Sequence, residues 1–418
     1  MATTFFLLAG EASGDMHAAK LIRALKEKRP DARFVGMGGP QMAAAGMEVD
    51  RDLDGMQVVG FWEVAKRYGF FKEVFYKLLD RVKQERPSAL ICIDYPGFNL
   101  RFAKEVRKLG IPVLYYIVPQ VWAWKEKRAA SMARIVDRAF CVFEFEPPFF
   151  ARFGLKTQFV GHPLMDCGLR PSVIPSETGD CGLERDAERK TVAMLPGSRD
   201  SELRAHVEPL CTAAHDVAGG RSGFRTLVSV PRGATRQYLA TAASYLQHRQ
   251  APWQVASAKG LRLSVDDSQL EKAAVLEHID GAPRELEIDT SHSFALPAVS
   301  DFSVVKSGTS TLEAGLAGNP LCVVYKGSPI SFAIAHLLVN IPVFSLINIV
   351  LGRYAVPELL QDEVNPVRIA AEIKRGLDDE RYREQQKTAL AELPKKLGGP
   401  GASARAAQGM LDFLAGRS

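Results

Sequence analysis

Short, wholly apolar segments alternate with amphipathic ones along almost the whole of this sequence. The clearest are Ala89–Ile93 and Val113–Val118 in the first half, and Val192–Leu195 and Leu321–Tyr325 in the second. Strands this apolar are buried on both faces, as in parallel sheets whose two sides are covered by helices. The pattern therefore predicts an α/β protein built from Rossmann-like domains with parallel sheets.

A change of character near the middle of the chain indicates where one domain ends. The chain has 418 residues, enough for two or three domains. From about Asp166 to Arg189, apolar periodicity gives way to Pro, Ser, Gly and charged residues, which is typical of a linker. The expected parts are a first domain over 1–168, a linker over 169–189, a second domain over 190–365, and helices over 366–418 that pack back on the first domain or on a partner chain.

One strand of the second half runs into a turn that suits a phosphate. The apolar run Thr191–Leu195 is followed by a Pro-Gly turn, with Ser198 at an N-cap position and Arg199 at the tip. Glu202 lies in the first helical turns. Backbone N–H groups, the positive end of a helix dipole and a guanidinium all favour an anion here. An ordinary βα turn with a solvated Arg199 is the alternative, since such turns are common.

A second turn of the same kind favours the phosphate interpretation. Asp301–Lys306 is expected to be a strand, Ser307, Gly308 and Thr309 a turn, and Ser310–Ala317 a helix opened by hydroxyl side chains. Two such turns in one half-chain predict a split site for a diphosphate.

Polar residues follow the strands of the first half directly. Glu11, Ser13 and Asp15 come after the first strand, and Asp94 comes after Ala89–Ile93. Ligands of open α/β sheets bind at the carboxyl ends of the strands, so these carboxylates are candidates for acid–base chemistry. An Asx turn or a helix N-cap is the competing interpretation of Asp94.

Two further segments are rich in aromatic and basic residues. In Pro119–Arg128, two tryptophans stand two residues apart and either flank a sugar or lipid or pack the domain. The segment Val58–Glu85 has apolar residues at helical spacing, which a core-facing amphipathic helix explains. Such a helix does not explain the crowding of Phe61, Trp62 and Phe70, and aromatic residues beside lysines are also typical of a helix at a membrane interface.

Several classes of site are disfavoured. The six cysteines lie singly and far apart, which predicts neither a metal site nor a disulfide framework and fits a reducing cytoplasm. No histidine pair has ligand spacing, no P-loop is present, and Gly36–Gly38 is only a fragment of a dinucleotide fingerprint. No stretch approaches about 20 apolar residues, so we expect no membrane-spanning helix. The net charge of +5 is mild and fits anionic ligands or an anionic membrane surface, and we expect no nucleic-acid partner.

Taken together, these segments resemble one family, the lipid-A-disaccharide synthases, which are GT-B-type glycosyltransferases. The matching segments occur in the family's order and cover nearly the whole chain: Ala9–Asp15, Gly36–Met42, Ile93–Asn99, Pro119–Trp124 with Arg128, Phe159–Leu164, Leu195–Arg199 with Glu202, Ser307–Thr309 with Leu312 and Glu313, and Val356–Gln361.

The resemblance implies a reaction and a location. The expected reaction is inverting transfer of diacylglucosamine from UDP-diacylglucosamine to diacylglucosamine-1-phosphate, giving the β-1,6-linked disaccharide of lipid A biosynthesis and UDP. The expected fold has two Rossmann-like domains facing one another across a cleft, with C-terminal helices crossing back to the first. The resemblance further implies no metal and no cofactor, peripheral attachment to the cytoplasmic face of the inner membrane, and scope for a homodimer.

The resemblance, read together with the strand-end positions, also assigns residues to four roles. Asp94 is the expected general base, with Glu11 or Asp15 as possible partners in that role. The expected donor site consists of Ser198, Arg199, Glu202, Ser307, Gly308, Thr309, Glu313 (which accepts from ribose hydroxyls) and Asn348. The expected acceptor site consists of Ser13, Asn99, Gln120, Trp122, Trp124 and Arg128. The expected membrane contacts are Phe61, Trp62, Phe70 and Phe71.

The sequence departs from the family pattern in places, and two rivals remain. Ile347 stands where proline is usual, Tyr354 where a glutamate usually follows Arg353, and Glu144 where proline is common, while residues 231–295 match poorly. Another GT-B protein, such as a UDP-N-acetylglucosamine epimerase or a murein-precursor transferase, would share the donor half and lack the segments Pro119–Trp124 and Ala9–Asp15. A non-catalytic UDP-sugar or lipid-binding protein would not need the carboxylate and arginine at the strand ends.

Overall fold

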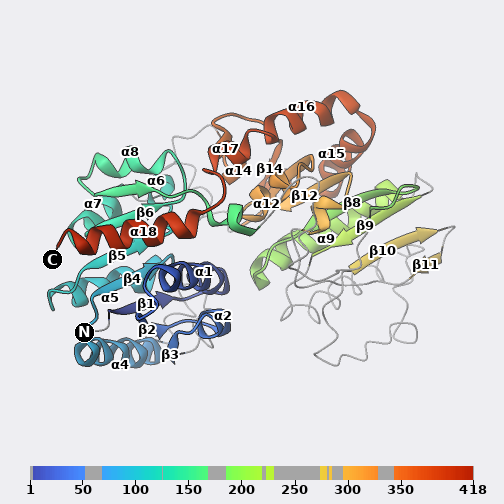
Figure 1. Cartoon of the computed structure of the whole chain (residues 1–418). Helices are drawn as coiled ribbons and strands as arrows, with labels where there is room; N and C mark the ends of the chain where they lie inside the picture. Colours follow the sequence, from blue (N-terminus) through green and yellow to red (C-terminus); the bar gives the residue numbers. More distant parts are fainter. Residues whose placement is uncertain are drawn as a thin grey trace. The chain divides into compact units, whose positions relative to one another are not determined.

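The structure, a computed structural model, describes residues 3–51, 68–124, 126–167, 185–218, 223–229, 274–279, 282–284, 295–327 and 343–417. The chain divides into two compact units, coloured along the sequence in Figure 1. The first unit comprises Met1–Asp166 together with Leu397–Ser418, and the second comprises Cys167–Lys396.

The sheet of the first unit is entirely parallel, as its apolar strands predict. Its order is β3-β2-β1-β4-β5-β6-β7. The strands β2 and β3 are added on one side of β1 and the strands from β4 onward on the other, so the strand order reverses between β1 and β4. This reversal matters because ligands of doubly wound sheets bind at such a switch point. The strands are β1 Thr4–Ala9, β2 Arg33–Met37, β3 Glu48–Arg51, β4 Ala89–Ile93, β5 Val113–Tyr116, β6 Arg138–Cys141 and β7 Thr157–Phe159.

Helices cover both faces of this sheet. On one face, Leu78 and Val82 of α4 and Phe102 of α5 share a buried core with Phe6 and Leu90 of the strands. On the other face α1 packs beside α18, the last helix of the chain (Figure 1). The helices are α1 Ala12–Lys28, α2 Pro40–Ala44, α4 Tyr68–Glu85, α5 Pro96–Arg107, α6 Val121–Trp124, α7 Glu126–Ile135, α8 Glu146–Ala151, the 3-10 turn Pro163–Cys167, and α18 Ala402–Ala415.

The second unit repeats the doubly wound plan with one departure. Its order is β11-β10-β9-β8-β12-β13-β14, and the switch point lies between β8 and β12. The strands from β9 to β14 in this order are parallel, but β10 pairs antiparallel with both β9 and β11, so the sheet is mixed rather than purely parallel as expected. The strands are β8 Lys190–Leu195, β9 Phe224–Val228, β10 Ala274–Ile279, β11 Ala282–Arg284, β12 Phe302–Lys306, β13 Leu321–Tyr325 and β14 Glu358–Leu360.

The helices expected to return to the first domain divide between the two units. The apolar stripe of α15, which includes Ile369 and Ile373, lies in the core of the second unit, and Gly376 lets the helix pack directly on the Phe302 ring. The return therefore begins at Leu397 rather than at Pro366. The helices of this unit are α9 Asp200–Ala218, α11 Ala295–Ala298, α12 Ser310–Leu316, α14 Leu346–Leu351, the 3-10 turn Gln361–Glu363, α15 Pro366–Asp378, α16 Glu380–Leu390 and α17 Leu393–Lys396.

The last helix is fixed to the first unit by a carboxylate. Asp166 accepts hydrogen bonds from the backbone N–H groups of Gly401 and Ser403, at 2.6 and 3.0 Å, and so satisfies the amino-terminal end of α18. Met410 of this helix is fully buried, whereas Leu411 and Leu414 stay partly exposed. Part of the apolar surface of the C-terminal helix is thus covered within the chain.

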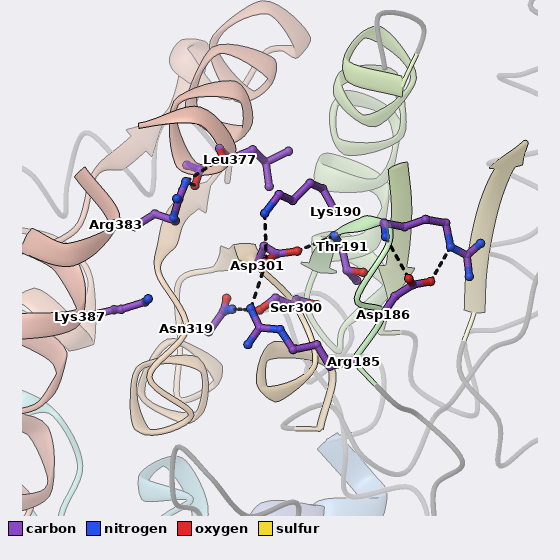
Figure 2. A network of polar contacts seen from close by, with 12 residues as sticks. Arg185, Asp186, Lys190, Thr191, Ser300, Asp301, Asn319, Leu377, Arg383 and Lys387 are labelled. Atoms are coloured by element: carbon purple, nitrogen blue, oxygen red, sulfur yellow. Dashed lines mark hydrogen bonds and ion pairs between the residues drawn. The ribbon is translucent and has the colours of Figure 1, made fainter. Parts of the chain in front are cut away.

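Figure 2 shows how the amino-terminal ends of β8 and β12 are joined. Asp301 accepts a hydrogen bond from the Thr191 N–H at 2.9 Å and forms an ion pair with Arg185 at 3.1 Å. Lys190 lies 3.8 Å from the same carboxylate. These contacts set the register of the two strands whose opposite ends form the switch point of this unit.

Among the described residues, no helix is both long and apolar enough to cross a membrane.

Candidate functional site

The first candidate site lies at the β1–β4 end, which we define as Gly10, Glu11, Asp94 and Tyr95. Ala9 and Ile93 are partners in the parallel register, so the residues that follow them emerge side by side. The Tyr95 ring lies against Gly10, where any Cβ would overlap it. A glycine is therefore required for the ring to cross the end of β1. Burial raises the pKa of Tyr95, and the charge of Glu11 raises it further, which places that carboxylate near the phenol.

The backbone at this end is strained and held in place. Asp94 and Tyr95 have φ values of +44° and +47°, a region that residues other than glycine seldom adopt. The Asp94 carbonyl accepts hydrogen bonds from the Tyr115 hydroxyl at 2.6 Å and from Asn99 Nδ2 at 2.8 Å. Strain of this type costs on the order of 1–3 kcal/mol per residue and is concentrated at functional sites. The Asp94 side chain, half-buried, is consequently set by a fixed backbone.

Asn99, expected to contact the acceptor, donates hydrogen bonds from its Nδ2 to the scaffold, whereas its buried Oδ1 has no hydrogen-bond partner among the described residues. Its side chain is fully buried, and Nδ2 also lies 3.3 Å from the Leu8 carbonyl and 3.2 Å from the Ile93 carbonyl. The amide thereby ties together the ends of β1 and β4. Its Nδ2 also helps to position Asp94.

Asp15, expected among the catalytic carboxylates, caps another helix. Its oxygens accept hydrogen bonds from the N–H groups of Gly39, Gln41 and Met42 at 2.9–3.0 Å, and the residue is buried. Three of its acceptor positions are engaged by the N–H groups at the start of α2, so we propose a structural role for this carboxylate rather than proton transfer. Glu11, at the N-cap position of α1, remains a candidate partner for Asp94, and Ser13 is exposed in the first turn of α1.

The tryptophan segment is held by Glu146, which the sequence reasoning missed. Glu146 is fully buried and accepts hydrogen bonds from Trp122 Nε1 at 3.2 Å and from the N–H groups of Val142 and Phe143 at 3.0 Å. Burial raises the pKa of Glu146 to about 8, although these donors oppose the rise. Trp122 is therefore at least partly a structural residue, which its strand-end position alone could not reveal.

The structure describes how far two of the three remaining residues of the predicted acceptor site are exposed. Gln120 is exposed, and the side chain of Trp124 lies outside the described residues. Arg128 is half-buried. Burial raises the pKa of Tyr115, and the charge of Arg128 opposes that rise.

The second candidate site lies at the β8–β12 end, which we define as Ser198, Arg199, Glu202 and Lys306. The helix α9 begins at Asp200, and the Arg199 carbonyl accepts the Leu203 N–H at 2.9 Å. The N-cap position thus belongs to Arg199, one residue later than the sequence predicted. Ser198 instead donates its backbone N–H to Glu202 Oε2 at 3.0 Å.

Glu202 joins the two turns of this end. Its Oε1 lies 2.6 Å from Lys306 Nζ and 3.3 Å from Arg199 Nη1. Burial on its own would raise the pKa of Glu202, but the charge and hydrogen bond of Lys306 outweigh it and the pKa lies below its usual value. Lys306 is a functional candidate that the sequence reasoning overlooked. Its position as the last residue of a strand was the signal that could have found it.

His206 fixes the helix that carries Glu202. Its Nδ1 lies 2.7 Å from the Glu202 carbonyl, and its Nε2 accepts the Lys326 N–H at 2.9 Å. The second bond requires Nε2 to be unprotonated, so Nδ1 carries the proton. Burial lowers the pKa of His206, which suits this neutral form.

The second turn, Ser307–Thr309, is only partly available to a ligand. The Ser307 N–H is used by the Val324 carbonyl at 2.9 Å, and Thr309 occupies the N-cap position of α12 without a side-chain capping bond. Gly308 has open space where a side chain would stand. Glu313 is half-buried in the first turn of that helix.

Asn348, expected to contact the nucleotide, has its amide group occupied by its own loop. Nδ2 donates to the Val356 carbonyl and to Glu358, each at 2.8 Å, and Oδ1 accepts the N–H groups of Ala355 and Val356. The residue is fully buried. Its role in the structure is to shape the loop before β14.

The predicted membrane contacts are only partly described. Phe61 and Trp62 lie outside the described residues. Phe70 and Phe71 pack partly against the core of the first unit, so the core interpretation holds in part for these two.

Among the residues that the structure describes, no group of three or more His, Cys, Asp or Glu side chains could hold a metal ion.

Comparison with known proteins gives a consistent result. A family model described as lipid-A-disaccharide synthetase matches residues 5–259 and 256–408. The lipid-A-disaccharide synthase of Anaeromyxobacter dehalogenans is 38% identical over 412 residues, covering 98% of this chain and 97% of the relative. That of Myxococcus xanthus is 35% identical over 408 residues, with 98% and 97% covered.

Solved structures extend the likeness to the fold. The S. aureus MnaA structure with UDP has a TM-score of 0.66 at 12% identity, covering 99% of this chain and 97% of that one. The kitacinnamycin glycotransferase has a TM-score of 0.57 at 14% identity, with 98% of each chain covered. The predicted fold class, two Rossmann-like α/β units of GT-B type, is confirmed by these likenesses.

Proposed function

Since the chain belongs to the lipid-A-disaccharide synthase family, and is therefore a glycosyltransferase of lipid A biosynthesis, we propose that it joins UDP-diacylglucosamine to diacylglucosamine-1-phosphate. The acceptor's 6-hydroxyl attacks the anomeric carbon of the donor as the bond to UDP breaks. The products are the β-1,6-linked disaccharide-1-phosphate and UDP, formed with inversion.

The observation that carries this proposal is a carboxylate residue at the β1–β4 end whose backbone is held by hydrogen bonds. Inverting transfer needs a base on the attacking hydroxyl. Asp94 follows β4 at the switch point, on a backbone held by Tyr115 and Asn99. We assign the base role to Asp94 and leave Glu11, its neighbour across the strand ends, as the partner carboxylate.

The departing UDP needs electrostatic relief, which the β8–β12 end is suited to supply. Arg199 offers a guanidinium fork, and α9 directs the positive end of its dipole to the same turn. Groups that meet developing charge in place typically contribute a few kcal/mol each to the transition state. Because Arg199 and the helix dipole supply the counter-charge, we expect EDTA to leave the rate unchanged.

A turnover assay with both lipid substrates tests the proposal. Mass spectrometry should detect the disaccharide-1-phosphate only when donor and acceptor are both present, and the proton coupling at the new anomeric centre should be that of a β-linkage. Conversion of UDP-N-acetylglucosamine alone would favour the epimerase rival. Tight binding of both lipids with no turnover would favour a non-catalytic binding protein.

We further propose that the enzyme meets its lipids at the cytoplasmic face of the inner membrane. Pulling acyl chains fully into water costs about 0.8 kcal/mol per CH₂, so the substrates are best met in the bilayer. The segment Val58–Lys83 combines Phe61, Trp62 and Phe70 with basic residues, and Lys72 is exposed on α4. Each such cation adds on the order of 1 kcal/mol near anionic lipid.

Serine substitution tests this surface. Changing Phe61, Trp62 and Phe70 together to serine should weaken binding to vesicles that contain anionic lipid, while UDP binding survives. The matched control is Val367→Ser, which alters an apolar side chain that is 75% exposed on the second unit. Unfolding of the triple variant would show that these aromatic residues belong to the core.

A further inference from the structure

The Glu202 carboxylate makes the contacts that a bound phosphate would make. Oε2 accepts the backbone N–H groups of Ser198 and Arg199 at 3.0 and 3.3 Å. Oε1 accepts from Lys306 Nζ at 2.6 Å and from Arg199 Nη1 at 3.3 Å. Two backbone donors, an ammonium and a guanidinium thus converge on one anionic group, an arrangement typical of phosphate sites.

Lys306 is held so that its ammonium faces this position. The side chain is only 14% exposed and that of Glu202 only 13%. The Tyr325 ring lies 5.7 Å from Nζ and provides a second, cation–π contact. Lys306 ends β12 and Arg199 follows β8, so the two cations come from the two strands that flank the switch point.

Bringing two cations together in a half-buried site is unfavourable without an anion between them. In this structure Glu202 supplies that anion. A diphosphate carries more negative charge than one carboxylate, and its oxygens can take the same four contacts. A diphosphate could therefore replace the Glu202 carboxylate while Lys306 and Arg199 each keep an anionic partner.

We propose that Lys306 is a second cation of the donor's diphosphate site and that Glu202 occupies this site until the nucleotide binds. The inference rests on the proposed use of a UDP-linked donor and names the residues that bind its diphosphate. On binding, a phosphoryl oxygen replaces Glu202 Oε1 between Lys306 and Arg199, and the carboxylate moves aside.

Calorimetric titration of the full chain with UDP and with uridine separates diphosphate contacts from contacts to the nucleoside. Lys306→Met should weaken UDP binding by about 10- to 100-fold, the loss of one charge-assisted hydrogen bond, and leave uridine binding unchanged. Glu202→Gln removes the competing charge and should tighten UDP binding by about threefold or more. Lys306→Arg, which keeps the charge, should restore most of the UDP affinity.

The matched control is Lys326→Met, which removes an exposed charge beyond the end of β13 that makes no side-chain contact with Glu202 among the described residues. An equal loss of UDP affinity in this variant would show that Lys306 acts only through the general positive electrostatic field of the unit. That result would overturn the inference. So would unchanged UDP affinity in Lys306→Met, or weaker binding in Glu202→Gln.

Failure of the proposed function gives a different result. In that case the wild-type chain itself fails to bind UDP or to form the disaccharide, whatever the variants do. If Lys306→Met lowers the unfolding midpoint, the comparison of UDP with uridine still decides, since a general loss of fold weakens both ligands.

Discussion

Replacing Tyr115 with phenylalanine removes one of the two hydrogen bonds that hold the Asp94 carbonyl. The hydroxyl lies 2.6 Å from that oxygen, and the ring is fully buried, so the packing is kept. The carbonyl retains the Asn99 amide at 2.8 Å and is not left without a partner. The expected loss is that of one net hydrogen bond, about 0.5–1.5 kcal/mol of unfolding free energy.

The same interaction sets the expected loss of rate. If the bond serves to hold Asp94 in its strained conformation, all of its free energy is available to position the base. A loss of 0.5–1.5 kcal/mol corresponds to about a two- to tenfold fall in kcat. The KM for the UDP-linked donor should not change, because the nucleotide is bound by the other unit.

Steady-state rates at varied donor and acceptor concentrations, with chemical denaturation in parallel, provide the test. Tyr116→Phe is the matched control, because Tyr116 is equally buried, lies next in β5 and points to the opposite face of the sheet. Full kcat in Tyr115→Phe, together with the expected loss of stability, would refute the positioning role. A fall in kcat that Tyr116→Phe reproduces would refute its specificity.

Three further predictions concern single side chains. Arg199→Ala should cost about 2–4 kcal/mol of transition-state stabilisation, measured as kcat/KM, if it meets charge on the leaving group. Asp94→Asn should abolish turnover and leave UDP affinity nearly intact, and a parallel fall in both would make Asp94 structural. For Glu146, the folded-state pKa of about 8 lies above the ordinary 4.5, so the folded state holds this proton more tightly. Its contribution to stability is therefore present below pH 4.5 and is lost as pH rises towards 8. The unfolding free energy of the wild type minus that of Glu146→Gln should decline across this pH range. A difference that stays constant with pH would show that Glu146 titrates normally.

The sequence predicted the framework well because the signal was local. Apolar strands followed by polar residues mark strand ends, and strand ends mark the two switch points, so Asp94, Glu11 and Arg199 could be located without coordinates. The mixed part of the second sheet was missed, since β10 and β11 fall in a stretch without clear periodicity. The point at which the chain returns to the first unit was also predicted too early. The apolar face of an amphipathic helix shows that the helix packs on a core, but not on which of two cores.

The roles of individual residues were harder to predict, and the reason is hydrogen-bond demand. Strand-end position indicates proximity to a site but not which groups the backbone has already engaged. Asp15 follows the first strand as Glu11 does, yet its carboxylate accepts hydrogen bonds from three N–H groups at the start of α2. Lys306 obeys the same positional rule as Arg199, but the sequence pattern includes it in the strand rather than in the turn that follows.

Buried amides at the strand ends show the same physical demand in both units. The last carbonyls of a parallel strand lie beyond the sheet ladder, and a buried carbonyl without a donor costs free energy. Asn99 Nδ2, with two hydrogens, lies within 3.3 Å of three carbonyls at the ends of β1 and β4, and Asn348 Nδ2 donates to the Val356 carbonyl in the loop before β14. An asparagine that follows a strand in a doubly wound fold therefore has two competing roles, ligand contact or carbonyl partner. Hydrogen bonding decides between them for each amide group separately: Nδ2 of Asn99 and of Asn348 bonds to backbone carbonyls and stabilises the chain there, and in Asn99 this contact influences the reaction through the position of Asp94.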